Sequence, residues 1–377
     1  MFYFDNAATG GTKPDSVLSA TTAAMKICAN PGRGGHSLAL ACAKTVEHSR
    51  RALCELFDGY TTDRIIFTKN CTEALNLALL GTLRRGDHAI ATCMEHNSVL
   101  RPLERLKKAG LITYDICPLH GDGANANVRT QDIMRLVKPN TKLVAVTTAS
   151  NVTGTAPPIE RLRALLPDRI LLLCDGAQGA GHLLLRMQTW GIDMLTLAGH
   201  KGMLGIQGSG ALLFSPRVDP TPLLYGGTGS MSISLDMPDF YPDALEAGTL
   251  AFPAIVSLLE GARHLQVKQD EIAQKCTLLT DYLLRGLQDL TTYVAYSQPN
   301  PCGIVAFRHK RLQSEYIASA LSTRYSIAVR GGLHCAPLMH AALGTAEDGL
   351  VRASFSHFNS QTEIDALLAA LKELQTR

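Results

Sequence analysis

Residues 168–214 read DRILLLCDGAQGAGHLLLRMQTWGIDMLTLAGHKGMLGIQGSGALLF, and two short apolar runs within them decide the fold. The first run, residues 170–174, is followed by DGAQ, and the second, residues 194–198, by GHKG. Short apolar runs of this kind are typical of strands buried on both faces of a parallel sheet. Ligand-binding groups gather beyond the carboxyl ends of such strands. The pattern therefore predicts an α/β fold with Asp175 and Lys201 at one edge of its sheet.

These two residues suit one kind of cofactor chemistry. A lysine at the end of a buried strand is a candidate Schiff-base nucleophile, because apolar surroundings lower the pKa of its amine. An aspartate on a neighbouring strand can hold a protonated pyridine nitrogen. Each residue also has an ordinary explanation, since a strand-end aspartate often caps a helix and most lysines are solvated. Together Asp175 and Lys201 form the arrangement that a pyridoxal phosphate (PLP) enzyme needs.

Composition narrows the classes of function open to the chain. Its 377 residues carry a formal net charge of +3 without a Lys/Arg block, so nothing favours a nucleic-acid partner or an anionic membrane surface. No apolar run could span a bilayer and the N-terminus does not resemble a secretory signal, so we expect a cytoplasmic protein. None of the ten cysteines forms a CxxC pair, which removes the usual zinc and dithiol patterns.

Polar residues also follow three earlier apolar runs, at residues 64–68, 88–92 and 142–148. Helical patterns separate these runs, and alternating strands and helices imply parallel pairing with right-handed crossovers. The carboxyl ends of the strands should therefore meet at one edge of the sheet. Just past those ends lie Thr72, His96, Asn151, Asp175, Gln178 and Lys201. Six separate helix caps are a poor explanation for six such residues at one edge.

A phosphate-binding element is predicted after the strand at residues 64–68. Asn70 and Glu73 have the spacing of a capping box, so a helix begins there. Its free amides and the Thr72 hydroxyl would form a cradle for a phosphate, although the cap explains these residues without a ligand. A dinucleotide-binding fold needs G-x-G-x-x-G after its first strand. The chain has no such element, which argues against NAD.

The stretch RGGLHCAPLM, residues 330–339, is the second informative one. Pro337 suits the first turn of a helix, which places Cys335 at or just before the helix N-terminus. There the helix dipole and His334 would favour the thiolate, and the glycines would let the loop move. A buried cysteine near a cap is the simpler alternative. Further on, Arg352 stands among apolar residues and is well matched to a substrate carboxylate.

Ten segments resemble the class V aminotransferases, PLP enzymes of fold type I, and within them the cysteine desulfurase and selenocysteine lyase branch. They are FDNAATG, RGGHSLA, IIFTKNCTEALNLA, EHNSV, ASNVTGT, LCDGAQGAGH, AGHKGMLGIQG, EAGT, RGGLHCAPLMH and VRASFSHFN. The resemblance implies a large PLP-binding domain, residues 16–255, with a mainly parallel seven-stranded sheet and helices on both faces. Residues 256–377 would form a smaller α+β domain carrying the Cys335 loop, and residues 1–15 would belong with it.

The resemblance also implies roles for individual residues. Lys201 would bind PLP as a Schiff base, Asp175 would pair with the pyridine nitrogen, and Gln178 would hydrogen-bond the ring oxygen. His96 would stack on the ring and move protons, and Cys335 would accept the sulfur. Further cofactor contacts would come from Cys71, Thr72, His200 and, from a second subunit, Thr249, and substrate contacts from Asn151, Arg352, Arg330 and Arg33.

The resemblance thus implies a homodimer that converts L-cysteine to L-alanine and leaves a persulfide on Cys335, or that acts on L-selenocysteine. A sulfur-acceptor protein would be its partner. One alternative is another class V enzyme, an aminotransferase, β-lyase or epimerase, in which Cys335 is not catalytic. Another is a non-catalytic, PLP-binding sulfur carrier. The chain departs from the family at Ala198, where a hydroxyl residue commonly contacts the phosphate.

Overall fold

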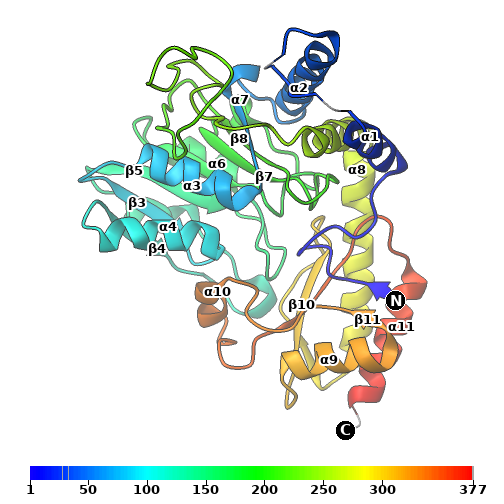
Figure 1. The fold of residues 1–377 in the computed structure, drawn as a ribbon. Helices are drawn as coiled ribbons and strands as arrows, with labels where there is room; N and C mark the ends of the chain where they lie inside the picture. The colour runs from blue at the N-terminus through cyan, green and yellow to red at the C-terminus, as the bar shows by residue number, and fades with distance from the viewer. Residues whose placement is uncertain (28, 33, 376–377) are drawn as a thin grey trace.

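The computed structural model describes residues 1–27, 29–32 and 34–375, and its larger lobe is built on a seven-stranded sheet (Figure 1). The strands lie in the order β2-β8-β7-β6-β5-β3-β4. Only β8 runs antiparallel to its neighbours within this sheet. The strands are β2 (Ile65–Thr68), β3 (His88–Thr92), β4 (Thr113–Cys117), β5 (Thr141–Thr147), β6 (Leu171–Asp175), β7 (Met194–Ala198) and β8 (Gly210–Phe214).

The apolar strands alternate their side chains between two hydrophobic layers. Leu172 points into one layer, and Leu171 and Leu173 point into the other, as the period of two along a strand requires. Helices α3 (Cys71–Thr82) and α4 (Asn97–Lys108) cover one face of the sheet. The other face is covered by α2 (Ser37–Leu56), α6 (Ile159–Leu165) and α8 (Phe252–Gln288). The α/β fold with helices on both faces is confirmed.

The edge strand β4 was not predicted from the sequence. Its residues, TYDIC, mix polar and apolar side chains and only Cys117 is fully buried. This strand pairs on one side only and is largely open to solvent, so it lacks the continuous apolar run that marks the other strands. Strand β8, in contrast, pairs antiparallel with both β2 and β7.

The smaller lobe is an antiparallel sheet of order β12-β10-β9, with strands β9 (Tyr293–Ala295), β10 (Ile304–His309) and β12 (Val351–Ser354). It packs with α9 (Ser314–Tyr325) and α11 (Gln361–Gln375). Strand β1 (Phe2–Tyr3) pairs in parallel with β11 (Ile327–Ala328), so the N-terminal segment lies against this lobe. The remaining helices are α1 (Asp15–Met25), α5 (Thr130–Arg135), α7 (Met187–Trp190) and α10 (Pro337–Ala342).

Helix α8 joins the two lobes (Figure 1). Leu258 and Leu265 lie in a core of the larger lobe, and Leu279 and Leu283 lie in the core of the smaller one. The predicted boundary between residues 255 and 256 falls in the first turns of this helix. The division into residues 1–15, 16–255 and 256–377 stays a prediction.

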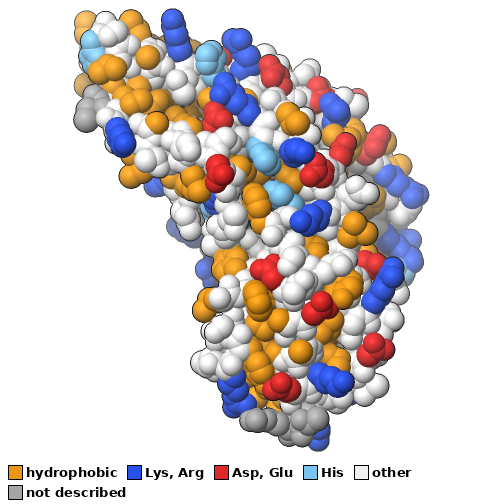
Figure 2. Space-filling model, turned by 90° about the vertical axis from the view of Figure 1, so that its right-hand side faces the viewer, with side chains coloured by type: hydrophobic (Ala, Val, Ile, Leu, Met, Phe, Trp, Pro, Cys, Tyr) orange, Lys and Arg blue, Asp and Glu red, His pale blue; other side chains and the backbone are white. Residues whose placement is uncertain are grey.

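Acidic and basic side chains are interspersed over the face shown in Figure 2. Every helix within residues 1–27, 29–32 and 34–375 is too short or too polar to cross a membrane. In that same part of the chain, no three His, Cys, Asp or Glu side chains come together as possible metal ligands.

Candidate active site

A pocket with roughly 480 Å³ of empty space lies at the carboxyl ends of β5, β6 and β7 and at the N-termini of α3 and α4. All six residues predicted to share one sheet edge line it: Thr72, His96, Asn151, Asp175, Gln178 and Lys201. Cys71, Ser98, Ala198 and His200 line it as well. Parallel pairing with right-handed crossovers is therefore enough to bring these six residues to one pocket.

Two glycines let Lys201 reach this pocket. A Cβ atom on Gly202 would lie 2.3 Å from the carbonyl oxygen of Ala180, and one on Gly181 would lie 2.1 Å from the carbonyl oxygen of Gly202. The loops after β6 and β7 therefore touch backbone to backbone. Burial lowers the pKa of Lys201 below its usual range, and the neighbouring carboxylate of Asp175 opposes that shift.

Asp175 is fixed at the end of β6 by two donors. Its Oδ1 accepts a hydrogen bond from the backbone N–H of Ala177 at 2.9 Å and lies 3.4 Å from Sγ of Cys71. The same sulfur lies 3.2 Å from the Thr196 hydroxyl. Burial raises the pKa of Cys71 well above its usual value, so this group is a thiol that can donate. The carboxylate is held in place and is 3 % exposed.

His96 caps α4 and presents one ring nitrogen to the pocket. Its Nδ1 accepts the backbone N–H of Ser98 at 3.0 Å, and the Ser98 hydroxyl lies 2.9 Å from the same nitrogen. Because Nδ1 accepts, the neutral ring carries its proton on Nε2. Burial lowers the pKa of His96, and Lys201 reinforces this while Asp175 opposes it. A neutral imidazole held in this way offers an Nε2–H that can donate to a ligand in the pocket.

The phosphate-binding end was predicted at the start of α3. Asn70 caps this helix by accepting the N–H of Glu73 at 2.9 Å, and the other first-turn amides have no intrahelical partner. The Thr72 hydroxyl lies 2.8 Å from that of Ser98, a residue that the sequence analysis did not single out. Ala198 contributes no hydrogen-bonding side chain. Ser98 thus adds a hydroxyl beside that of Thr72 in the same pocket.

His200 has an orphaned polar atom beside this end of the pocket. Its Nδ1 is buried and finds no hydrogen-bond partner among the described residues. Burial, with Lys201 and Lys13 nearby, lowers the pKa of His200 to about 4. A buried nitrogen without a partner is costly unless a ligand supplies one. This observation, with the lysine and carboxylate described above, fits a PLP phosphate and ring in the pocket.

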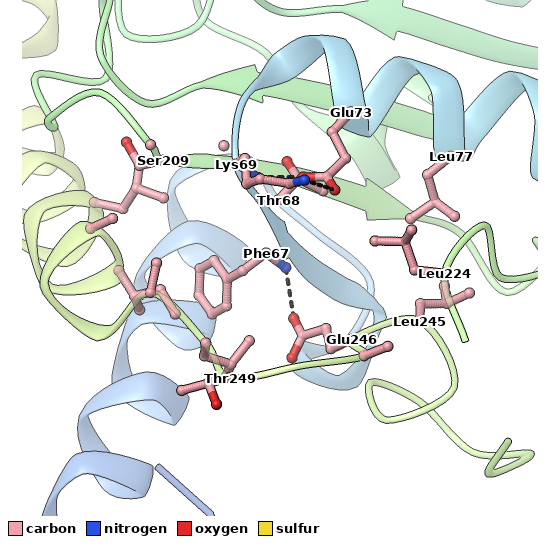
Figure 3. Close-up of a pocket in the computed structure, with 18 of the residues that line it drawn as sticks. Phe67, Thr68, Lys69, Glu73, Leu77, Ser209, Leu224, Leu245, Glu246 and Thr249 are labelled. Carbon is pink, nitrogen blue, oxygen red and sulfur yellow. Dashed lines mark hydrogen bonds and ion pairs between the residues drawn. The ribbon is translucent and has the colours of Figure 1, made fainter. Parts of the chain in front are cut away.

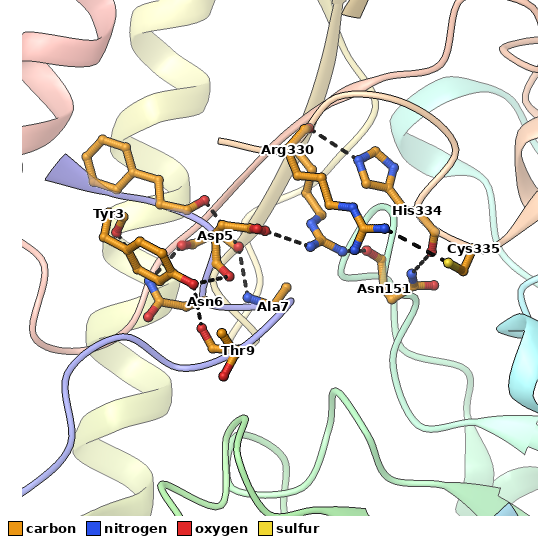
Figure 4. A network of polar contacts seen from close by, with 12 residues as sticks. Tyr3, Asp5, Asn6, Ala7, Thr9, Asn151, Arg330, His334 and Cys335 are labelled. Atoms are coloured by element: carbon orange, nitrogen blue, oxygen red, sulfur yellow. Dashed lines mark hydrogen bonds and ion pairs between the residues drawn. The ribbon is translucent and has the colours of Figure 1, made fainter. Parts of the chain in front are cut away.

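Arg352 lies on β12 and contacts Asp5 and Asn151, two members of the polar network shown in Figure 4. One Nη donates to the carbonyl of Asn151 at 2.8 Å and the other to Oδ1 of Asp5 at 2.9 Å. Its Nε is buried without a partner among the described residues. The guanidinium is 1 % exposed, so Asp5 balances a charge that would otherwise be buried alone. Asp5 was not among the residues predicted from the sequence.

The Cys335 loop of the smaller lobe reaches across to α4. The Asn97 N–H donates to the Cys335 carbonyl at 2.8 Å, which ties this loop to the residue after His96. Cys335 is exposed, and its sulfur lies 3.9 Å from Nη2 of Arg330 (Figure 4). Arg330 in turn pairs with Arg352 through two backbone hydrogen bonds.

The expectation that His334 supplies positive charge to Cys335 is wrong. His334 is 2 % exposed, and burial with the nearby Arg352 holds its pKa well below the usual value. Its ring nitrogens lie 3.3 Å from His340 and 3.3 Å from the Arg330 carbonyl, so the ring is neutral and already paired. Among the described residues, the cation that contacts the sulfur is Arg330.

The glycines of this loop serve close packing. A Cβ atom on Gly331 would lie 2.7 Å from the carbonyl oxygen of Ser314, and one on Gly349 would lie 2.7 Å from Cα of Gly332. The expectation that they let the loop move finds no support in this packing.

The family model of class V aminotransferases matches residues 2–367. The chain belongs to this family. A probable cysteine desulfurase from Aeropyrum pernix is 34% identical and covers 100% of this chain and 95% of its own length. One from Methanothermobacter thermautotrophicus is 31% identical, with 99% and 94% coverage. The apo structure of cysteine desulfurase from Thermococcus onnurineus NA1 superposes with a TM-score of 0.89 at 30% identity, over 100% of this chain and 94% of that one.

For three residues, the structure does not show the contact that the resemblance to class V aminotransferases implies. Gln178 lines the pocket, but its Nε2 donates to the Ala7 carbonyl at 3.0 Å. Thr249 lines a different, apolar pocket with Phe67 and Leu224 (Figure 3), and its hydroxyl lies 3.4 Å from the Asn30 amide. Within one chain, Thr249 is therefore not at the Lys201 pocket. Arg33 lies outside the described residues.

Proposed function

We propose that this class V aminotransferase is a PLP-dependent cysteine desulfurase that converts L-cysteine to L-alanine and leaves a persulfide on Cys335. One observation carries the proposal. The hydrogen bond from Asn97 to the Cys335 carbonyl brings Cys335, whose thiol is exposed, to the residue that follows His96 of the Lys201 pocket. An aminotransferase has no use for a thiol there. The similarity to cysteine desulfurases over the whole chain length supports the same assignment.

The residues of the pocket would hold PLP in one orientation. Lys201 would bind it covalently through its amine, Asp175 would face the ring nitrogen, and His96 would stack on the ring. Gln178 would face the ring oxygen, and Thr72, Cys71 and His200 would complete the contacts at this side of the pocket. Bound there, PLP supplies an electron sink for the Cα of the amino acid.

The substrate's carboxylate would be held at the arginine end of the pocket. Arg352 keeps its Nε unpaired, Asn151 lies beside it, and Arg330 is its neighbour on the adjoining backbone. A lysine amine whose pKa is lowered by burial is a competent base, so Lys201 would remove the Cα proton. His96, with its proton on Nε2, would return protons during product formation.

Sulfur transfer would then need the Cys335 thiolate. Its sulfur attacks the sulfur of L-cysteine, and a sulfur–sulfur bond forms as the Cβ–sulfur bond breaks. The electron pair of the broken bond stays with the carbon fragment, which takes up a proton and leaves as alanine. Cysteine and the enzyme thiol thus become alanine and an enzyme persulfide, and an acceptor protein or a thiol reductant removes the outer sulfur.

Alanine release from L-cysteine and L-selenocysteine, with and without a thiol reductant, tests the proposal. We expect Cys335→Ala to lose at least about 100-fold of its turnover with L-cysteine, the size typical of removing a catalytic group. Cys54→Ala, at a half-buried cysteine, is the matched control and should keep its activity. Retained turnover of another amino acid by Cys335→Ala would favour an aminotransferase, β-lyase or epimerase. Absence of steady-state turnover in the wild type would favour a sulfur carrier.

Selenocysteine separates the two branches of the family. A selenium leaving group is more acidic than a sulfur one, so release of alanine from L-selenocysteine should depend less on Cys335. A wild-type enzyme that turns over only L-selenocysteine would be assigned as a selenocysteine lyase.

The assembly and location belong to the same proposal. The position of Thr249 outside the Lys201 pocket supports a homodimer in which the second subunit's Thr249 completes the site. All nine described cysteines are unpaired, as is usual in a reducing compartment, which supports a cytoplasmic enzyme.

A further inference from the structure

A chain of three polar side chains lies behind the Cys335 loop, and the proposed chemistry does not use it. We call His334, His340 and Thr345 the histidine relay. His334 Nδ1 lies 3.3 Å from His340 Nε2, and His340 Nδ1 lies 2.9 Å from the Thr345 hydroxyl. The two rings stack with centroids 5.5 Å apart, and each histidine is at most 2 % exposed.

The direction of every hydrogen bond in the relay can be deduced. The Arg330 carbonyl, 3.3 Å from His334 Nε2, can only accept, so that nitrogen carries the proton and Nδ1 of His334 accepts. Nε2 of His340 must then donate to it, which leaves Nδ1 of His340 to accept from Thr345. The hydroxyl's contact with the His340 carbonyl is longer, at 3.4 Å. Both rings are neutral, in agreement with the lowered pKa of His334 and of His340 that their burial causes.

The relay is hydrogen-bonded at one end to the backbone of the Cys335 loop, and this backbone has an uncommon conformation at His334 and Cys335. His334 and Cys335 have φ angles of 52° and 58°, in the left-handed region that costs a residue other than glycine about 1 kcal/mol or more. Such strain persists only where the surroundings impose it. Besides the relay, the Asn151 amide binds the His334 carbonyl at 2.6 Å, and the Asn97 N–H binds the Cys335 carbonyl.

We propose that the histidine relay is a positioning device for sulfur transfer, which holds the strained loop so that Cys335 faces Arg330 at the mouth of the Lys201 pocket. The inference rests on the proposed desulfurase function. His334 occupies the centre of the arrangement, since its ring binds the Arg330 carbonyl and its carbonyl binds Asn151. A shift of the relay therefore displaces the thiol and the substrate-side amide together. Misplacement by about 1 Å can cost a reaction about 100-fold.

His340 lies on α10, so a substitution there breaks the relay without changing a residue of the Cys335 loop. His340→Leu removes the donor to His334, whereas His340→Gln places an amide donor at about the position of Nε2. His309→Leu is the matched control, because His309 is a 4 % exposed histidine on β10 whose Nδ1 accepts two backbone N–H groups. All are prepared as holoenzymes, with thermal unfolding measured for each.

Two readouts separate positioning from stability. The first is the rate at which iodoacetamide alkylates Cys335 at pH 7, followed by mass spectrometry of its peptide. The second is kcat and KM for alanine release from L-cysteine. We expect His340→Leu to change the alkylation rate by about tenfold and to lower kcat by about 10- to 100-fold, while His340→Gln recovers both to within about threefold. His309→Leu should lower the unfolding temperature and leave both readouts unchanged.

Equal alkylation rates and kcat in wild type and His340→Leu would overturn the proposal, as would an equal loss in His340→Gln and His340→Leu. If His340→Leu does not fold, Thr345→Val, which removes only the hydroxyl donor, replaces it with the same direction of effect expected, and an unchanged alkylation rate would count against the relay. The alkylation rate needs no turnover. A wild type that releases no alanine would therefore refute the desulfurase function while the relay is still tested.

Discussion

Arg330 is the residue whose role changes most between sequence and structure. The sequence suggested a substrate contact, and the structure places its guanidinium 3.9 Å from the Cys335 sulfur. The Arg330 Nη2 donates a hydrogen bond to that sulfur and so holds it in one position. We expect Arg330→Gln to change the rate at which iodoacetamide alkylates Cys335 at pH 7 by about tenfold, because the sulfur is then displaced, while Arg330→Lys keeps most of the rate. Equal rates in wild type and Arg330→Gln would contradict this role.

Glu95 is a buried carboxyl whose titration should be visible in the stability of the protein. Its Oε1 accepts from the Thr92 hydroxyl at 2.6 Å and from the Thr147 N–H at 3.0 Å, and burial raises its pKa to about 8. The carboxyl of an unfolded glutamate has a pKa of about 4.3. Between these values the folded chain binds one proton more than the unfolded chain, so the stability falls as the pH rises through this window.

Glu95→Gln removes this dependence. The free energy of unfolding of the variant relative to wild type should rise by about 1.4 kcal/mol per pH unit between about pH 5 and pH 8. Urea unfolding at pH 5.5, 6.5 and 7.5 measures it. Parallel stability curves for the two proteins would show that the Glu95 carboxyl is already ionised in the folded state.

The residues that could be predicted from sequence are those whose position follows from the strand pattern. Asp175 ends β6 and Lys201 lies three residues after the end of the neighbouring strand β7, so parallel pairing is enough to bring them together. Asp5 and Ser98 could not be found in this way. Asp5 and Arg352 are more than 340 residues apart in the sequence. Ser98 lies in the first turn of α4, and no sequence pattern connects it with Thr72 on α3.

At the level of elements, the apolar strands were predictable, including the edge strand β2, and the half-polar edge strand β4 was not. Strands β6 and β7 are buried throughout and lead into polar motifs, whereas β4 alternates polar and apolar residues and is only partly buried. The role of two glycines could also be seen only in the structure. Gly181 and Gly202 lie where the loops after β6 and β7 touch, and this contact joins residues that are far apart in the sequence.

Gly202→Ala tests this contact between loops. Its new Cβ would lie 2.3 Å from the Ala180 carbonyl oxygen, which belongs to backbone and cannot rotate away. We expect a loss of about 1–3 kcal/mol in the free energy of unfolding and weaker PLP binding, because Lys201 is the adjacent residue. Gly35→Ala, where a Cβ meets nothing within 4 Å, is the control. Unchanged PLP affinity in Gly202→Ala would show that the loops can separate without moving the lysine.

At the scale of the whole molecule, one chain leaves apolar surface exposed and leaves Thr249 away from the Lys201 pocket. Ile233 and Leu235 are fully exposed, and Leu224 and Thr249 line the apolar pocket of Figure 3. Large exposed apolar side chains of this kind mark interaction surfaces. A second subunit that covers them would account for both the surface and the distance of Thr249 from its expected site.

Heterodimers of two variants test whether Thr249 of one subunit contributes to the PLP site of the other. Thr249→Ala should weaken PLP binding about 10- to 100-fold, the value of about 1.5–3 kcal/mol for a hydrogen bond to a charged group, and Lys201→Ala should abolish desulfurase activity. If Thr249 works across the dimer, then in a heterodimer of the two variants the intact Lys201 site receives an intact Thr249 from its partner. Such heterodimers, purified with two different tags, should therefore recover about half of the wild-type activity at low PLP concentration, whereas both homodimers stay inactive there. If Thr249 instead serves its own chain, the only site with a lysine still lacks the hydroxyl, and mixing restores nothing.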